Sequence, residues 1–244
     1  DSTAILDDIQ VYTRFYKVIA LVYSGYMEIF GMTAQIEDLG KSYLQEKITL
    51  EYAEEKKRLI HAEINFALQS ANQRNKELAL PELKTERFRL LAQSFYNYVK
   101  ALPQSIENGT EISLNLFNAS ISGDQVLIQK YDIMTRQNLI TMIEGENLIA
   151  KSTIAQTKEG NPNAWLYKTF VCSNEAMIAI IKARISEMEM SSDDVGINFQ
   201  SEDSHTYIKL AKISVKTAYN LIATGRTKIE SHREDFRNAT SSGD

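Results

Sequence analysis

Glu202 and His205 stand in the spacing Glu-x-x-His, which is half of a known kind of metal site. A di-iron or di-manganese centre in a helical bundle takes two such pairs and one glutamate from each of two further helices. The second pair is missing from this chain, because neither His61 nor His232 has a glutamate three positions before it. Glu202 and His205 are therefore the metal candidates of the sequence, and they make only half a site.

The same stretch also has the composition of a helix N-terminus. Ser201 is a good N-cap residue, because its hydroxyl can accept a hydrogen bond from a backbone N–H of the first turn. Glu202 and Asp203 follow it and place negative charge where the helix dipole favours it. The capping interpretation explains three consecutive residues and the metal interpretation two, so we favour a helix start.

Other residues that could do chemistry lack the partners that they need. Carboxylates occur in pairs at Glu144-Gly-Glu146 and Glu187-Met-Glu189, where solvated helix faces explain them. Cys172 lies in an apolar helical context and is expected to be an inert core thiol. The chain has no glycine-rich phosphate loop and no Gly-x-Ser-x-Gly turn. We therefore expect no enzyme, no catalytic residue and no cofactor.

Two sets of side chains could form a binding surface. The tyrosines Tyr12, Tyr16, Tyr23 and Tyr26 could line a pocket, although their heptad spacing favours packing between helices. Lysines recur on one face of the last helix, at Lys209, Lys212 and Lys216, where a solvated face is the usual explanation and an acidic partner or anionic lipid the alternative.

The first helix, expected over residues 3–39, has the clearest apolar pattern. Two adjacent rows of apolar residues repeat at alternating steps of four and three, one starting at Ile5 and the other at Val11. Together they form a face wider than a two-stranded coiled-coil seam. This helix should therefore lie between at least two neighbours. Gly40 is the expected stop.

The remaining elements also read as helices. They are expected over 41–78, from Pro81 to a kink or end at Pro103, over 124–158, over 162–190 and from 202 to Phe236. Residues 104–124 combine strand-like alternation with helical spacing, and we favour helix because a lone strand has no partner. Asp124 and Asn161 are the expected N-caps, with Pro162 at a first helical position. Residues 191–201 form a connection, and a disordered tail starts at about 238.

Composition limits the classes of function. A formal net charge of -5 and a pI near 5.4 argue against nucleic-acid binding, which requires a basic surface. Three prolines and ten glycines in 244 residues suit long helices better than a β fold. No window reaches the roughly 18–20 apolar residues of a transmembrane segment. The first residue, Asp1, is not methionine, which favours an exported or periplasmic protein.

These observations predict an all-α protein, an elongated antiparallel bundle of five to seven long helices in a single domain over residues 1–244. The leading functional hypothesis is a non-enzymatic interaction or structural module whose partner is another protein or a second copy of the chain. One alternative is a ligand-binding or sensor-type helical domain. A further alternative is a membrane-active protein that inserts residues 18–32 into a bilayer. The charged residue Glu28 within this segment argues against that alternative.

Overall fold

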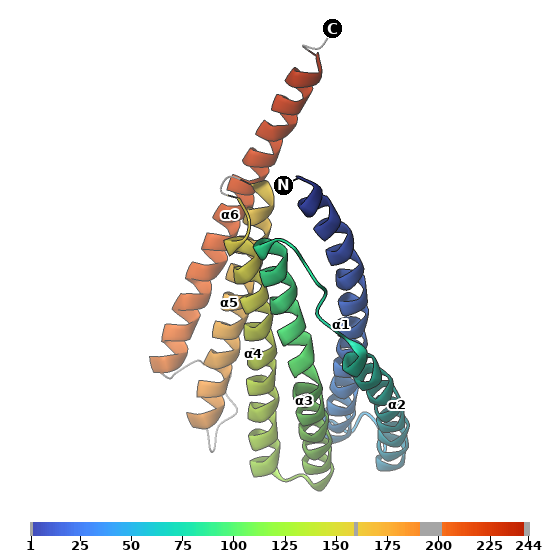
Figure 1. The fold of residues 1–244 in the computed structure, drawn as a ribbon. Helices are drawn as coiled ribbons and strands as arrows, with labels where there is room; N and C mark the ends of the chain where they lie inside the picture. The colour runs from blue at the N-terminus through green and yellow to red at the C-terminus, as the bar shows by residue number, and fades with distance from the viewer. Residues whose placement is uncertain (1, 159–160, 191–201, 242–244) are drawn as a thin grey trace. The chain divides into compact units, whose positions relative to one another are not determined.

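The computed structural model describes residues 2–158, 161–190 and 202–241, which form six helices and no strand (Figure 1). The helices are α1 (Ser2–Leu44), α2 (Leu50–Glu77), α3 (Glu86–Ser122), α4 (Gln125–Ala155), α5 (Pro162–Met190) and α6 (Glu202–Ser241). The prediction of an all-α bundle with five to seven helices is confirmed. The ambiguous residues 104–122 lie within α3, so the helical interpretation was correct there.

The chain divides into two compact units, Asp1–Met142 and Ile143–Asp244, and the boundary between them falls inside α4. The first is called unit 1 and the second unit 2. The single domain expected for residues 1–244 stays a prediction. Over the part of the chain that the structure describes, no helix combines the length and apolar composition needed to cross a membrane.

The core of unit 1 is built along α1, which packs against both α2 and α3. The prediction that this helix lies between two neighbours is therefore confirmed. Its buried residues follow heptad steps of four and three: Phe15, Ile19, Val22, Tyr26, Ile29, Thr33, Ile36 and Gly40. This buried row takes members from both predicted rows, and others, such as Ile5, Ile9 and Val18, are exposed. The fully buried row is therefore narrower than the predicted face, and partly buried residues such as Val11 and Tyr23 pack beside it.

A non-helical crossover, residues 78–85, makes α1 and α3 run parallel (Figure 1). The rings of Tyr12 and Phe88 are in contact near the start of both helices, and Glu37 meets Ser113 much further along both. The consecutive helices α1 and α2 are antiparallel, as predicted from their short connection. A proline at position 81 had predicted a helix start there, but α3 begins at Glu86, because the crossover first returns along α1.

Asp8 of α1 binds the end of this crossover through hydrogen bonds. Its carboxylate accepts hydrogen bonds from the backbone N–H groups of Lys84 and Thr85 at 2.8 and 2.7 Å, and from the Thr85 hydroxyl at 2.6 Å. Thr85 is the N-cap residue of α3, yet its own side chain makes no capping bond. Asp8 therefore supplies negative charge to the N-terminus of α3 from another helix.

The predicted helix end at Gly40 is wrong, since α1 continues to Leu44 and α2 begins only at Leu50. Gly40 is buried, and a Cβ atom placed on it would come within 3.0 Å of the Ser120 side chain and 3.4 Å of the Phe117 Cα atom. A glycine at this position allows α1 and α3 to approach closely. It does not act as a C-cap.

Pro103 does not end its helix, because α3 continues through it to Ser122. The break predicted after residue 122 is confirmed: Gly123 adopts the left-handed conformation with φ 69°, and the Asp124 carboxylate accepts a hydrogen bond from the N–H of Leu127 at 3.1 Å. Pro162 is the first residue of α5, as predicted. The helix α6 continues to Ser241, past its expected end, because the first strong breaker after Phe236 is Gly243.

Unit 2 contains the end of α4 and an antiparallel hairpin of α5 and α6. Small buried residues on both helices allow close packing: Ala176, Ala179, Ala183, Ala211, Ala218 and Gly225. A Cβ atom placed on Gly225 would lie 2.9 Å from the Trp165 Cβ atom, so the first turns of α5 meet the later part of α6.

Candidate functional site

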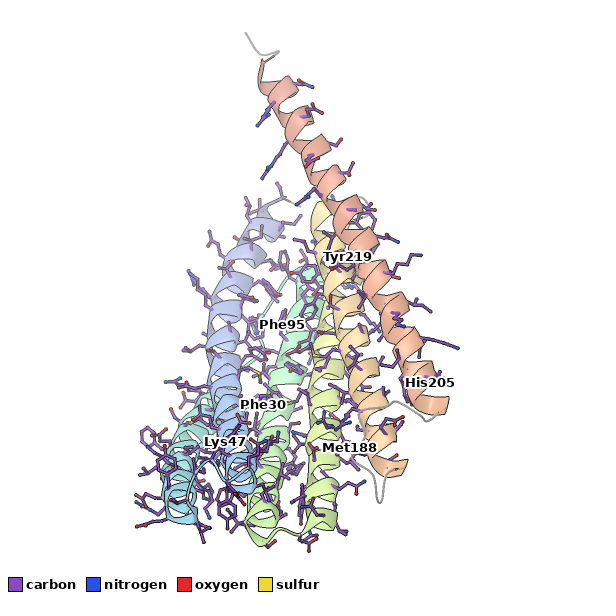
Figure 2. The ribbon with its side chains drawn as sticks, turned by 180° about the vertical axis from the view of Figure 1, so that it is seen from behind. Phe30, Lys47, Phe95, Met188, His205 and Tyr219 are labelled. Atoms are coloured by element: carbon purple, nitrogen blue, oxygen red, sulfur yellow. The ribbon has the colours of Figure 1, made fainter. Side chains whose placement is uncertain are left out.

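The Glu202-x-x-His205 spacing lies at the start of a helix. The helix α6 begins at Glu202, and His205 is exposed near that end (Figure 2). Ser201, its predicted N-cap, and the side chain of Glu202 lie outside the described residues. Within the described ranges, no three or more His, Cys, Asp or Glu side chains come together in a group that could hold a metal ion.

The predicted tyrosine set is divided between packing and a buried polar network. Tyr12 and Tyr16 contact rings of α3, at centroid distances of 5.3 Å to Phe88 and 5.8 Å to Phe95. Tyr23 likewise lies 6.1 Å from Tyr98. These contacts run along the parallel α1–α3 pair, as expected of interhelical packing.

Tyr26 is fully buried and donates a hydrogen bond to the Asn72 side chain at 2.8 Å. Burial raises the pKa of Tyr26 to about 12, with the Asn75 amide opposing this change and the charge of Glu107 adding to it. Tyr26 is therefore a neutral hydrogen-bond donor between α1 and α2 at physiological pH.

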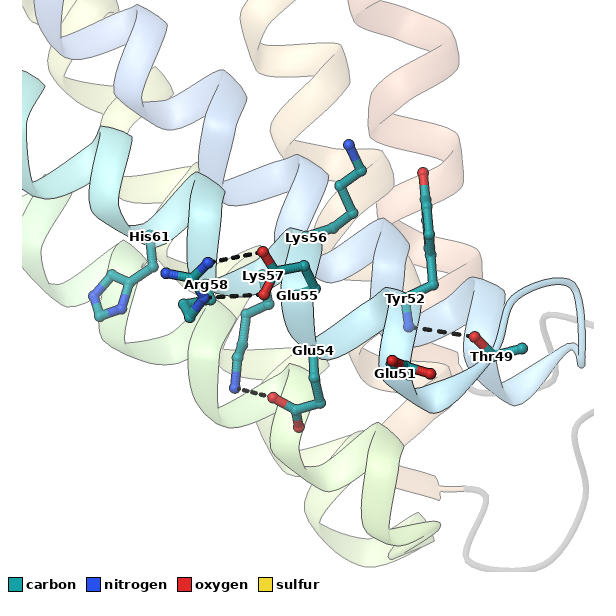
Figure 3. A pocket seen from close by; sticks show the side chains of 9 residues that line it. All are labelled: Thr49, Glu51, Tyr52, Glu54, Glu55, Lys56, Lys57, Arg58 and His61. Carbon is teal, nitrogen blue, oxygen red and sulfur yellow. Dashed lines mark hydrogen bonds and ion pairs between the residues drawn. The ribbon is translucent and has the colours of Figure 1, made fainter.

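His61 lies on an exposed surface of α2 that is lined by the helix itself and its N-cap, Thr49 (Figure 3). Ion pairs within the helix occupy this surface. Arg58 pairs with Glu55 at 2.7 Å, and Lys57 pairs with Glu54 at the same distance. A surface that comes from one helix and its cap offers no enclosed site.

Cys172 of α5 is partly buried rather than a full core residue. Burial raises the pKa of its thiol, and the nearby charge of Glu175 raises it further. The thiolate is the nucleophilic form of cysteine, so a raised pKa lowers the share of Cys172 in its reactive form.

One side of the α5–α6 hairpin carries a row of exposed apolar side chains from each helix. The residues of the α5 row are spaced by four, seven and three positions, and those of the α6 row by four and three. Such spacings bring side chains to the same side of a helix. We call these seven residues the hairpin face: Leu166, Phe170, Met177, Ile180, Val215, Tyr219 and Ile222.

The two rows share one side of the hairpin. Leu166 and Ile222 line a common hollow of about 290 Å³ together with Trp165. The exposed fractions are high for such large apolar side chains, 62% for Leu166 and 71% for Tyr219. Scattered exposed apolar residues are ordinary on a protein surface, but aligned rows on two adjacent helices form a contiguous patch.

Basic side chains border the hairpin face along α6. Lys212 and Arg226 are exposed, and they continue the α6 row at its two ends. Arg233, also exposed, lines the hollow at the Trp165 end, where Glu230 is the one acidic residue among the described residues of the lining. The apolar face therefore has a mainly basic margin, in a chain whose formal net charge is -5.

A second feature of unit 2 is a groove of about 560 Å³ between α4, α5 and α6. Two ion pairs cross it between α4 and α5: Lys151 with Glu175 at 3.5 Å, and Lys182 with Glu144 at 4.0 Å. We call it the charged groove. Tyr207, Leu210 and Ser214 of α6 line its other wall.

The floor of the charged groove holds a buried amide. Asn147 of α4 is 5% exposed and lines the groove, and within the described residues its Oδ1 atom accepts no hydrogen bond. Most buried polar atoms in proteins are hydrogen-bonded, because leaving an acceptor unpaired costs its full desolvation penalty. Asn174 of α5 is also buried, with its Nδ2 atom unpaired, but it does not line the groove.

Reasoning from the sequence missed the charged groove and placed Glu144 on a solvated face. A signal was present: Glu144 to Lys151 and Glu175 to Lys182 are both Glu-x6-Lys, in consecutive helices. When two such helices pack antiparallel, each lysine meets the glutamate of the other. An ion pair at each end of a shared groove is the expected result.

Comparisons of the chain with protein-family models, with curated proteins and with solved structures found no match.

Proposed function

We propose that this chain is a non-enzymatic interaction module that docks an amphipathic helix of another protein on the hairpin face. The observation that carries this proposal is the alignment of seven exposed apolar side chains on one side of α5 and α6. Contiguous exposed apolar patches mark interaction sites, because leaving them in water forgoes the free energy of burial.

The spacing of the face suits a helix as its ligand. An amphipathic helix presents apolar anchors at i, i+3, i+4 and i+7, which match rows that repeat at steps of three, four and seven. The basic margin of Lys212, Arg226 and Arg233 favours a partner helix with acidic flanks. A second copy docked face to face would bring like charges together, so a different protein fits the surface better.

A designed peptide tests the proposal directly. The peptide is an amphipathic helix with leucine on one face and glutamate on both flanks, and its matched control has lysine at the flanks. Trp165, the single tryptophan, lies at one end of the hairpin face and reports binding by fluorescence. We expect the acidic peptide to bind and the basic peptide to bind at least tenfold more weakly.

Two variants distinguish binding at the hairpin face from nonspecific binding to exposed apolar residues. Tyr219→Glu should weaken the acidic peptide at least tenfold, because it places a charge in the apolar contact. Phe66→Glu changes an equally exposed aromatic residue on α2 of unit 1 and should leave binding unchanged. Equal binding by both variants, or self-association that Tyr219→Glu abolishes, contradicts the proposal. So does stronger binding to anionic vesicles than to the acidic peptide, or a turnover reaction by the purified protein.

A further inference from the structure

The charged groove places two opposite charges at each of its ends. Glu144 and Lys151 are seven residues apart on α4, and Glu175 and Lys182 are seven residues apart on α5. At 1.5 Å per residue, each pair spans about 10 Å of helix. A ligand that lies along the groove therefore meets one cation and one anion at either end, with about 10 Å between the two ends.

These charges are available to a ligand at little cost. Their N–O distances of 3.5 and 4.0 Å are long for charge-assisted hydrogen bonds, which are usually below 2.9 Å. All four side chains are about half exposed. Exposed ion pairs contribute little to stability, so exchanging them for contacts with a ligand costs the fold little.

Asn147 adds a specific requirement between the two ends. Its Oδ1 atom needs an N–H or O–H donor, and the antiparallel register of the two ion pairs sets Asn147 opposite Ala179. Alanine has no polar group to donate, and its small side chain leaves space at this point of the groove. Around it, Leu148, Ile178 and Leu210 supply apolar surface.

We propose that the charged groove binds a free peptide of about three residues. An extended tripeptide is about 10 Å long, which matches the separation of the two charged ends. Its terminal ammonium meets a glutamate at one end, its terminal carboxylate meets a lysine at the other, and a backbone N–H donates to Asn147 Oδ1. Its side chains pack on the apolar wall. This site is separate from the hairpin face and does not depend on the function proposed for that face.

Titration calorimetry with peptides of different length and termini tests the assignment. The probes are Ala-Leu-Ala, the same peptide with an acetylated N-terminus or an amidated C-terminus, and the dipeptide Ala-Leu. We expect the free tripeptide to bind, and each blocked form and the dipeptide to bind at least tenfold more weakly. Failure of the free tripeptide to bind overturns the proposal, as does equal binding of the blocked forms.

Two asparagine variants locate the site. Asn147→Leu should abolish binding of Ala-Leu-Ala, whereas Asn174→Leu, at the other buried asparagine of unit 2, should leave it within twofold of the parent protein. Circular dichroism establishes that each variant is folded. Equal losses in the two variants, or no loss in Asn147→Leu, contradict the assignment.

Charge reversal on the groove surface gives a test that does not change the core. Lys151→Glu leaves two glutamates and no lysine at one end, so the free tripeptide should bind in only one direction and at least twofold more weakly. Lys151→Glu with Lys182→Glu removes both cations and should abolish binding. Lys151→Glu with Glu175→Lys restores one cation and one anion at that end and should restore binding. Unchanged binding without both lysines overturns the proposal.

Discussion

At the scale of single residues, the clearest long-range constraint is the contact of Asp8 with the start of α3. The Asp8 side chain is nearly inaccessible, with 1% exposed, and this desolvation acts to raise its pKa. Hydrogen bonds from the Thr85 hydroxyl and from the N–H groups of Lys84 and Thr85, together with the charge of Lys84, outweigh it. The net result is a pKa below the ordinary value of 3.8.

This lowered pKa predicts how stability changes in acid. A group whose pKa is lowered by folding stabilises the protein above its unfolded pKa, and that contribution is lost as pH falls through the folded value. Asp8→Asn should therefore lower the urea midpoint at pH 7, and the difference from the parent protein should shrink as the pH falls below the ordinary value of 3.8. Urea unfolding at pH 7 and pH 2.5 measures both effects.

The neighbouring residue provides the control for this experiment. Asp7 makes an exposed ion pair with Lys84, and exposed pairs contribute little, so Asp7→Asn should leave the midpoint almost unchanged at pH 7. A difference between Asp8→Asn and the parent that is the same at both pH values argues against the assignment. It would mean that shape, and not ionisation, explains the loss.

Contacts between distant residues, such as that of Asp8 with Thr85, could not be predicted from the sequence. Asp8 meets Thr85 across 77 positions, and no local pattern indicates which aspartate caps a helix elsewhere in the chain. Asp124 and Gly123 were predictable, because a cap and a left-handed turn are set by adjacent residues. The unpaired Oδ1 of Asn147 could not be predicted either, since only the packing of distant segments determines which asparagine is buried.

At the scale of helices, glycine has two different roles that the sequence does not distinguish. Gly225 is in a helix interior where a Cβ atom would lie 2.9 Å from the Cβ atom of Trp165, while a Cβ atom on Gly31 would have open space within 4 Å. Alanine is favoured over glycine in a helix by about 1 kcal/mol. Against this, overpacking a well-packed contact costs about 1–3 kcal/mol.

These magnitudes predict opposite effects for the same substitution. Gly31→Ala should raise the melting temperature by about 2–4 °C, as expected for about 1 kcal/mol in a chain of this size. Gly225→Ala should lower it, because the Cβ atom of Trp165 is fixed to the backbone and cannot rotate away. The fluorescence of Trp165 should change in Gly225→Ala and stay constant in Gly31→Ala. A higher melting temperature for both variants contradicts the close contact of α5 and α6.

The helices themselves were predictable because apolar periodicity and turn chemistry are local. Pro162 marked the start of α5 correctly, since proline at a first helical position costs no hydrogen bond. The role of Gly40 was not predictable in this way, because its close approach to Ser120 depends on α3, and Ser120 lies 80 positions later in the chain. The same limit applies to the parallel run of α1 and α3, which follows from the path of residues 78–85 and not from their composition.

At the scale of the whole molecule, α4 links the two compact units through one uninterrupted helix. Met142 belongs to the core of unit 1, and Ile143 and Asn147, which follow it in unit 2, are buried. Unfolding either unit would leave about half of α4 without its packing partners. Isolated helices of that length are marginal in water, so unfolding one unit should destabilise the other.

We therefore expect the chain to unfold in one cooperative transition, as the single domain predicted from its sequence. Differential scanning calorimetry should give a calorimetric enthalpy equal to the van't Hoff enthalpy. Asp8→Asn in unit 1 and Gly225→Ala in unit 2 should both lower the temperature of that same transition. Two transitions, each shifted by only one of these variants, would show instead that the units unfold independently and that the continuity of α4 is too weak to couple them.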